Sequence, residues 1–192
     1  MNLIFDLYGT LIDTDEAALI TSRSELMEYG EGTWMKQPVK EEAFLARYAQ
    51  QKNLNEQELI TSFYALEQTT AFFTKIPALL TKLHAEGYTL HILSNCGLQI
   101  QTFIQKNQEV FNLFTTKNFS YEIGYTKPQI EAFKTVLKQM GVQPHECVMI
   151  GDNKDYDILP ARQLGLHTIH FVGRTQEPAD IVEKLAQIRK TL

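Results

Sequence analysis

Short runs of apolar residues alternate along this chain with longer stretches whose apolar positions recur every three or four residues. Apolar runs without a polar alternation are typical of strands that are buried on both faces of a parallel sheet. Strands that are separated by helices in this way indicate an α/β protein. The predicted strands are residues 3–5, 90–93, 147–150 and 168–172, with a weaker one at 115–119.

Three helices have clear sequence signals. Proline is favoured in the first turn of a helix and glycine just beyond its last turn. We therefore expect one helix from Pro77 to Gly87 and another from Pro128 to Gly141, with a third close to the C-terminus. The apolar stripes by which the last two helices should pack on the sheet are Ile130, Phe133, Leu137 and Met140, and Ile181, Leu185, Ile188 and Leu192.

The stretch from residue 14 to 75 has a different character. It is rich in helix-forming residues, has almost no strand signal, and is interrupted at Gly30 and Pro38. We interpret it as a small all-helical cap that is inserted after the first strand. The predicted organisation is a Rossmann-like core, a parallel sheet with helices on both faces, formed by residues 1–13 and 76–192, with the cap at 14–75.

The composition narrows the partners that the chain can have. A net charge of −5 with interspersed charges disfavours nucleic acid, whose phosphates attract clustered lysine and arginine. No apolar stretch reaches the ~20 residues of a membrane span, and the first residues lack the basic region of a signal peptide. Cys96 and Cys147 have no metal-ligand spacing and are too few for a disulfide framework. We expect a cytoplasmic protein without nucleic-acid or membrane partners, and nothing in the sequence indicates its oligomeric state.

Two polar clusters follow predicted strands. Asp6 stands at the end of the first strand, where ligands bind in open α/β sheets. Gly9 allows a tight turn, and Thr10 brings a hydroxyl into the same loop. Ser94 and Asn95 directly follow the second strand, where a hydroxyl and an amide can bind a phosphoryl oxygen. Each cluster, taken alone, also fits an ordinary turn.

Two further clusters carry charge. If Pro128 opens a helix, Lys127 lies at a helix N-terminus, where the dipole favours anions. Three carboxylates, Asp152, Asp155 and Asp157, follow a later apolar strand. They repel one another unless a cation neutralises them, and hard oxygen ligands of this kind suit Mg²⁺. A simple helix start and a solvated acidic loop would have the same residues, so neither cluster decides the function alone.

Together, and in this order, the four clusters resemble the four motifs of the haloacid dehalogenase superfamily, and the helical insertion resembles its cap. The resemblance covers the whole chain. It implies a hydrolase, a small-molecule phosphatase before other activities, in which Asp6 is a nucleophile that forms a covalent intermediate with a phosphorylated substrate. The catalytic residues that it implies are Asp6, Thr10, Ser94, Asn95 and Lys127, of which Ser94, Asn95 and Lys127 would bind the substrate.

The resemblance also implies a magnesium cofactor. Its ligands would be Asp6, the backbone carbonyl of Tyr8 and Asp152. Asp157 would hold a metal-bound water or orient Lys127. The cation would remove the repulsion between Asp6 and the substrate phosphate and would stabilise charge during transfer.

Tyr8 departs from the phosphatase pattern, in which a second aspartate stands at this position as general acid and base. A tyrosine here is a feature of the 2-haloacid dehalogenases, whose halide leaving group needs no proton. Those enzymes need no metal, whereas Asp152 and Asp157 form an acidic pair of the magnesium-phosphatase type. A member that binds a phosphorylated ligand without turnover is a third alternative, which the missing acid supports and the retained Asp6 and Lys127 oppose.

By the same resemblance, the cap selects the substrate. Arg23, Trp34, Lys36 and Arg47 lie in the predicted cap and could contact a substrate, although packing or surface positions are the simpler interpretation for each. The identity of the substrate is therefore left open by the sequence.

Overall fold

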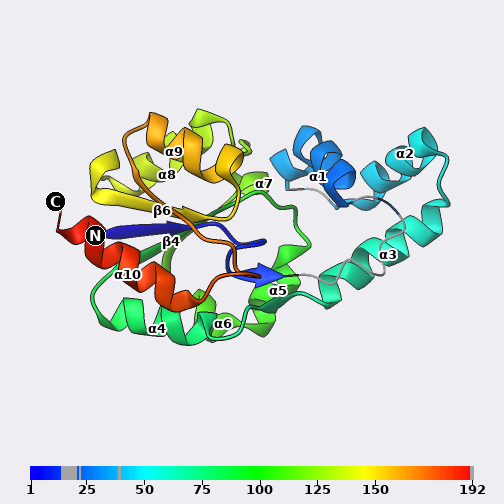
Figure 1. Cartoon of the computed structure of the whole chain (residues 1–192). Helices are drawn as coiled ribbons and strands as arrows, with labels where there is room; N and C mark the ends of the chain where they lie inside the picture. Colours follow the sequence, from blue (N-terminus) through cyan, green and yellow to red (C-terminus); the bar gives the residue numbers. More distant parts are fainter. Residues whose placement is uncertain (14–20, 22, 39, 191–192) are drawn as a thin grey trace.

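A five-stranded parallel sheet forms the centre of the molecule (Figure 1). The computed structural model describes residues 1–13, 21, 23–38 and 40–190 of the chain. The strands are β1 (Asn2–Phe5), β4 (Thr89–Ser94), β5 (Phe114–Phe119), β6 (Cys147–Gly151) and β7 (His167–His170). Their order is β5-β4-β1-β6-β7, and every neighbouring pair is parallel. Each strand lies on a predicted apolar run, although β7 ends two residues early. The predicted fold class, an α/β protein with a Rossmann-like core, is confirmed.

Helices cover both faces of the sheet (Figure 1). In β1, Leu3 and Phe5 pack against one layer of helices and Ile4 packs against the other, which explains the unbroken apolar run of these three residues. The first layer comprises α4 (Ile76–Ala85), α5 (Ile100–Lys106), α6 (Gln108–Phe111) and α10 (Pro178–Arg189), and the second comprises α8 (Ile130–Met140) and α9 (Leu159–Gln163). The short turns between elements are α7 (Ser120–Ile123), η3 (Pro144–Glu146) and η4 (Lys154–Ile158). Leu192, which was predicted to extend the stripe of α10, lies outside the described residues.

A second group of helices lies beside the carboxyl ends of the strands (Figure 1). It consists of α1 (Arg23–Gly32), η2 (Trp34–Lys36), α2 (Glu42–Lys52) and α3 (Glu56–Gln68). These helices have their own apolar core, in which Trp34 is fully buried, and η2 contacts α7 of the main body. The limits of the cap at 14–75 stay a prediction. Within the described part of the chain, no helix combines the length and the apolar character of a membrane span.

The chain passes between the sheet and these helices through two short strands. β2 (Ile12–Asp13) and β3 (Ala71–Phe72) pair antiparallel, and Phe73 N donates a hydrogen bond to Leu11 O at 3.0 Å. The all-helical interpretation of residues 14–75 is therefore wrong at β3. Two residues are too few for a period-two pattern to show in the sequence.

The prediction that Pro128 opens a helix is also wrong, because α8 begins at Ile130. Lys127 and Pro128 form a turn before the helix. Asn95 holds this turn, since its Oδ1 accepts a hydrogen bond from Lys127 N at 2.7 Å. Lys127 is thus placed by a neighbouring loop and not by a helix N-terminus. The predicted end is confirmed at Gly141, which has a left-handed φ of 68°.

Candidate active site

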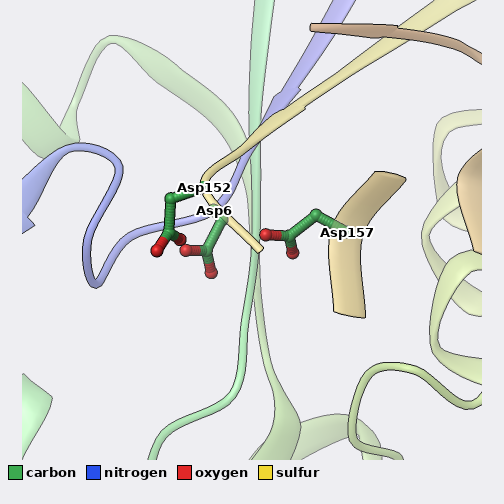
Figure 2. A group of neighbouring side chains, drawn as sticks. All are labelled: Asp6, Asp152 and Asp157. Carbon is green, nitrogen blue, oxygen red and sulfur yellow. The ribbon is translucent and has the colours of Figure 1, made fainter. Parts of the chain in front are cut away.

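Three aspartates converge at the carboxyl ends of β1 and β6 (Figure 2). Asp6 directly follows β1, Asp152 directly follows β6, and Asp157 lies in the η4 turn that comes next. Since β1 and β6 are neighbouring parallel strands, their ends meet at one edge of the sheet. One carboxylate oxygen from each residue lies within 4.8 Å of the others. Asp155, the third acidic residue of the predicted loop, is exposed to solvent instead.

Lys127 supplies the positive charge of this cluster. Its Nζ donates to Asp6 Oδ1 at 2.6 Å and to Asp157 Oδ1 at 2.5 Å, and its side chain is 3% exposed. Burial by itself lowers the pKa of Lys127, but the charges of Asp157 and Asp6 outweigh burial and hold that pKa above its usual value. The side chain is therefore an ammonium that is fixed between two carboxylates.

The cluster carries more negative than positive charge. Burial and the charge of Asp6 raise the pKa of Asp152 to about 6. Burial raises the pKa of Asp157 to about 7, against the opposing charge of Lys127. Raised carboxyl pKa values mean that the ionised forms are costly here, and a divalent cation would remove that cost. Carboxylate oxygens are the donors that suit Mg²⁺.

The loop after β1 brings its backbone against the cluster. Gly9 has a φ of +83°, and a Cβ at this position would lie 2.4 Å from Asp152 Oδ2, so only glycine fits. The buried Thr10 hydroxyl lies 3.2 Å from both Asp6 Oδ2 and Asp152 Oδ1. Its single proton serves one carboxylate at a time. Thr10 therefore links the first and the last of the four sequence clusters.

Asn95 and Ser94 differ in their hydrogen bonds. Besides accepting from Lys127 N, Asn95 donates from Nδ2 to Lys127 O at 2.8 Å and to Glu31 Oε1 at 3.0 Å. Ser94 ends β4, and its hydroxyl is buried with no hydrogen-bond partner among the described residues. A buried hydroxyl normally has a partner, which a bound substrate could supply. The roles of both residues in binding substrate stay predictions.

A cavity of about 420 Å³ opens onto the cluster. On the core side, the predicted residues Asp6, Tyr8, Asn95, Lys127, Asp152 and Asp157 line it. Asn153 and Tyr156, which the sequence analysis did not single out, join them. Thr10 and Ser94 are not part of the described lining. The structure thus gathers six of the eight predicted site residues around one space.

The cap residues suggested by the sequence do not line this cavity in the described part of the chain. Trp34 is buried in the core of the cap, and Arg47 is exposed. Lys36 is absent from the described lining, and the side chain of Arg23 lies outside the described part. The residues that do face the cavity from the cap are Met27, Glu28, Glu31 and Met35.

The sequence did contain a signal for the cap residues that face the cavity. Met27 and Glu28 precede Glu31 by four and three positions, which places both beside Glu31 on one side of α1. Glu31 reaches the core, because Tyr156 Oη donates to Glu31 Oε2 at 3.1 Å in addition to the bond from Asn95. Without the fold, nothing distinguishes this side of α1 from a solvated one.

Tyr8 is tied to the cap. Its hydroxyl donates to Glu67 Oε2 at 3.0 Å, near the end of α3. The phenol is partly exposed and lines the cavity together with Asp6. A carboxylate of the cap therefore lies one hydrogen bond away from the position at which the phosphatase pattern has its acid.

These features define a capped α/β protein. An aspartate follows β1 of its Rossmann-like sheet and pairs with a lysine, an acidic pair follows β6, and a helical layer lies over the cavity. Residues 3–171 match the family described as haloacid dehalogenase-like hydrolase. The chain belongs to this family, which confirms its predicted resemblance to the superfamily.

The relatives to which the chain is similar include named phosphatases. A glyceraldehyde 3-phosphate phosphatase of Methanothermobacter thermautotrophicus is 32% identical over 114 residues, 58% of this chain and 50% of that protein. The chain thus spans about half the length of this relative. Pyrophosphatase PpaX of Bacillus velezensis is 25% identical over 179 residues, 86% of this chain and 80% of that protein.

A solved structure supports the fold. An enzyme of the same family from Bacteroides thetaiotaomicron, in complex with magnesium and inorganic phosphate, has a TM-score of 0.63 with this chain. The two sequences are 22% identical, and the similarity covers 88% of this chain and 92% of that one. At this identity the likeness establishes the arrangement of helices and strands and nothing about the reaction.

Proposed function

We propose that this protein is a magnesium-dependent phosphatase of small phosphorylated molecules in which Asp6 is the nucleophile. The observation that carries the proposal is the buried ion pair between Asp6 and Lys127 at the base of the cavity, beside Asp152 and Asp157. This arrangement combines a carboxylate that can attack, an ammonium that can offset charge and an acidic pair that can hold a cation. The phosphatase names of the relatives support the same activity.

In the proposed reaction, an Asp6 oxygen bonds to phosphorus while the bond from phosphorus to the leaving-group oxygen breaks, which gives an aspartyl phosphate. A water oxygen then bonds to phosphorus while the bond to Asp6 breaks, which releases inorganic phosphate and regenerates Asp6, and a proton of that water ends on the leaving-group oxygen. Lys127 offsets the negative charge of the transferred group. Asn95 keeps Lys127 in place through two backbone hydrogen bonds, and the buried Ser94 hydroxyl donates to a phosphoryl oxygen.

Mg²⁺ is the proposed cofactor. Asp6, Asp152, Asp157 and the backbone carbonyl of Tyr8 would hold it. These residues suit Mg²⁺ because oxygens of three carboxylates lie within 4.8 Å of one another and their negative charge exceeds the positive charge of Lys127. When bound, the cation supplies positive charge that both the carboxylates and the substrate phosphate need.

A second candidate, the hydrolytic dehalogenation of a 2-haloacid, rests on Tyr8. A halide leaves without a proton, so a tyrosine can stand where a phosphatase needs an acid. The pairing of Asp152 and Asp157 favours the phosphatase, because gathering carboxylates is costly unless a cation is bound between them. A third candidate is a protein that binds a phosphorylated ligand without turnover. Such a protein needs no nucleophile, so the buried pair of Asp6 and Lys127 favours an enzyme.

One assay separates the three candidates. The purified protein is incubated with aryl, acyl and alkyl phosphates and with 2-haloacids, with Mg²⁺ and with a chelator. We expect phosphate release that the chelator abolishes and added Mg²⁺ restores. Halide release without metal would establish the dehalogenase instead, and phosphate-ester binding without release of either product would establish the binding protein.

Asp152→Asn should weaken the response to Mg²⁺. Loss of even an indirect partner of a metal ligand typically costs about 10–100-fold in affinity, so the Mg²⁺ concentration for half-maximal activity should rise at least about tenfold. The metal-free variant should be no less stable than the wild type, because the raised pKa of Asp152 marks a charge that is costly without a cation. Activity and melting temperature are measured across a Mg²⁺ titration. Asp155→Asn is the matched control, since this carboxylate is exposed; equal titration curves for wild type and Asp152→Asn would remove Asp152 from the metal site.

Tyr8→Asp should place an acid at the position where phosphatases of this family carry one. The gain in kcat/KM should grow with the pKa of the leaving group, up to the roughly 10²–10⁴-fold that general acid catalysis contributes. Part of the gain is lost, because the variant gives up the bond to Glu67 and adds a charge near Asp152. The measurement is kcat/KM for esters of graded leaving-group pKa, with Tyr8→Phe as the control without an acid. A uniform loss across the series would show that Tyr8 has another role.

A further inference from the structure

The cap side of the cavity is negatively charged. Glu28 and Glu31, both on α1, face the space above Asp6 and Lys127. Within the described lining, Lys127 is the one basic side chain, and it is already paired with two carboxylates of the core. The part of the substrate that extends away from the phosphate therefore meets acidic side chains.

Glu31 is held in place by neutral groups. Asn95 Nδ2 and Tyr156 Oη donate to its two carboxylate oxygens at 3.0 and 3.1 Å. These donors fix the carboxylate without cancelling its charge as an ion pair would. Burial raises the pKa of Glu31, and the hydrogen bonds from Asn95 and Tyr156, followed by the charge of Lys127, oppose that rise. A carboxylate accepts about four hydrogen bonds, so Glu31 keeps acceptor sites for a substrate.

The charges of the described part of the cavity lining favour the same kind of substrate. Its described lining contains five carboxylates and one ammonium, and a divalent cation in the acidic cluster would leave two negative charges over. A phosphate ester adds further negative charge. A second anionic group on the leaving part would be repelled by Glu31, while a positive group would be attracted.

We propose that the preferred substrate is a phosphate monoester whose alcohol part carries an ammonium group, a short carbon chain away from the ester oxygen. The inference rests on the proposed phosphatase function and specifies its substrate class. With the phosphate at Asp6 and Lys127, the leaving part extends toward α1, where Glu31 binds the ammonium and Glu28 adds to the attraction. Met27 and Met35 supply apolar contacts for the carbon chain.

The test compares three esters that differ in the charge of the leaving part. These are 2-aminoethyl phosphate, 2-hydroxyethyl phosphate and carboxymethyl phosphate, each with Mg²⁺ and the full chain. Opposite charges a few ångströms apart near a protein surface change binding by about tenfold or more. We expect kcat/KM to fall at least about tenfold from the amine to the neutral ester, and again from the neutral ester to the carboxylate.

Two variants assign this preference to the cap. In Glu31→Gln, the amide oxygen still accepts from Asn95 and the amide nitrogen can donate to Tyr156, so the change removes charge and little else. It should reduce the preference for the amine over the carboxylate about tenfold or more. Glu28→Gln should act in the same direction but less, because Glu28 is exposed. Glu56→Gln removes an exposed cap carboxylate outside the described lining and should leave the ranking intact.

Each outcome bears on a different claim. Turnover of all three esters at similar kcat/KM, or a ranking that Glu31→Gln leaves unchanged, would overturn the inference while the phosphatase proposal stands. If aryl phosphates, acyl phosphates and these esters all fail to release phosphate, the phosphatase proposal fails, and the substrate class with it.

Discussion

Replacing Asp6 with asparagine should reduce phosphate release by about four orders of magnitude or more, because the amide cannot act as the nucleophile. The fold should survive the change. Lys127 keeps its ion pair with Asp157, and the amide oxygen can still accept a hydrogen bond from Thr10. The measurements are kcat with an aryl phosphate in Mg²⁺ and the melting temperature of the variant.

A quench experiment adds a direct readout of the covalent step. With a substrate labelled in its phosphate, acid-quenched wild-type protein should carry label and Asp6→Asn should carry none. Asp155→Asn makes the same chemical change at an exposed position and should behave like the wild type in both assays. More than trace activity in Asp6→Asn, purified free of the wild type, would contradict covalent catalysis at Asp6.

Lys127→Ala should slow phosphate release by about two orders of magnitude or more, because one preorganised positive charge is lost from the transferred group. It should also lower stability, since Asp6 and Asp157 stay buried without their counter-charge, a loss worth about 3–5 kcal/mol. Mg²⁺ should restore part of that stability by supplying charge to the same carboxylates. The melting temperature is therefore followed together with kcat across a Mg²⁺ titration.

The comparison at high Mg²⁺ separates the two effects of this substitution. Where the cation has restored the melting temperature of Lys127→Ala, a remaining loss in kcat reports the chemical role of the ammonium. Lys154→Ala, at an exposed lysine of η4, controls for the loss of charge near the site. A variant within a few-fold of wild type under those conditions would place Lys127 outside the reaction.

The core of the fold was predictable because its strands are buried on both faces. Leu3, Ile4 and Phe5 pack against two different helix layers, and an uninterrupted apolar run records that burial in the sequence. Asp6 and Asp152 could be assigned to one site for a related reason. Each follows such a run, and the ends of neighbouring parallel strands meet.

What the sequence did not predict depends on contacts between distant segments. Lys127 reaches Asp6 from a turn that Asn95 holds, although Asn95 lies 32 positions before Lys127 and Asp6 lies 121 positions before it. The side of α1 that bears Glu31 has no marker of its own, because a glutamate on a helix is ordinarily solvated. Only the packing of the cap over the strand ends shows that this carboxylate faces the cavity.

The paired strands β2 and β3 separate the cap from the strands that carry the reactive side chains, which protein engineering can use. The chain leaves the sheet through β2 and returns through β3, side by side, so α1 and η2 can vary without altering the strands that carry Asp6 and Asp152. Libraries confined to the cap side of the cavity should therefore change which molecules are accepted and leave the chemical step intact. The positions for such libraries are Met27, Glu28, Glu31 and Met35.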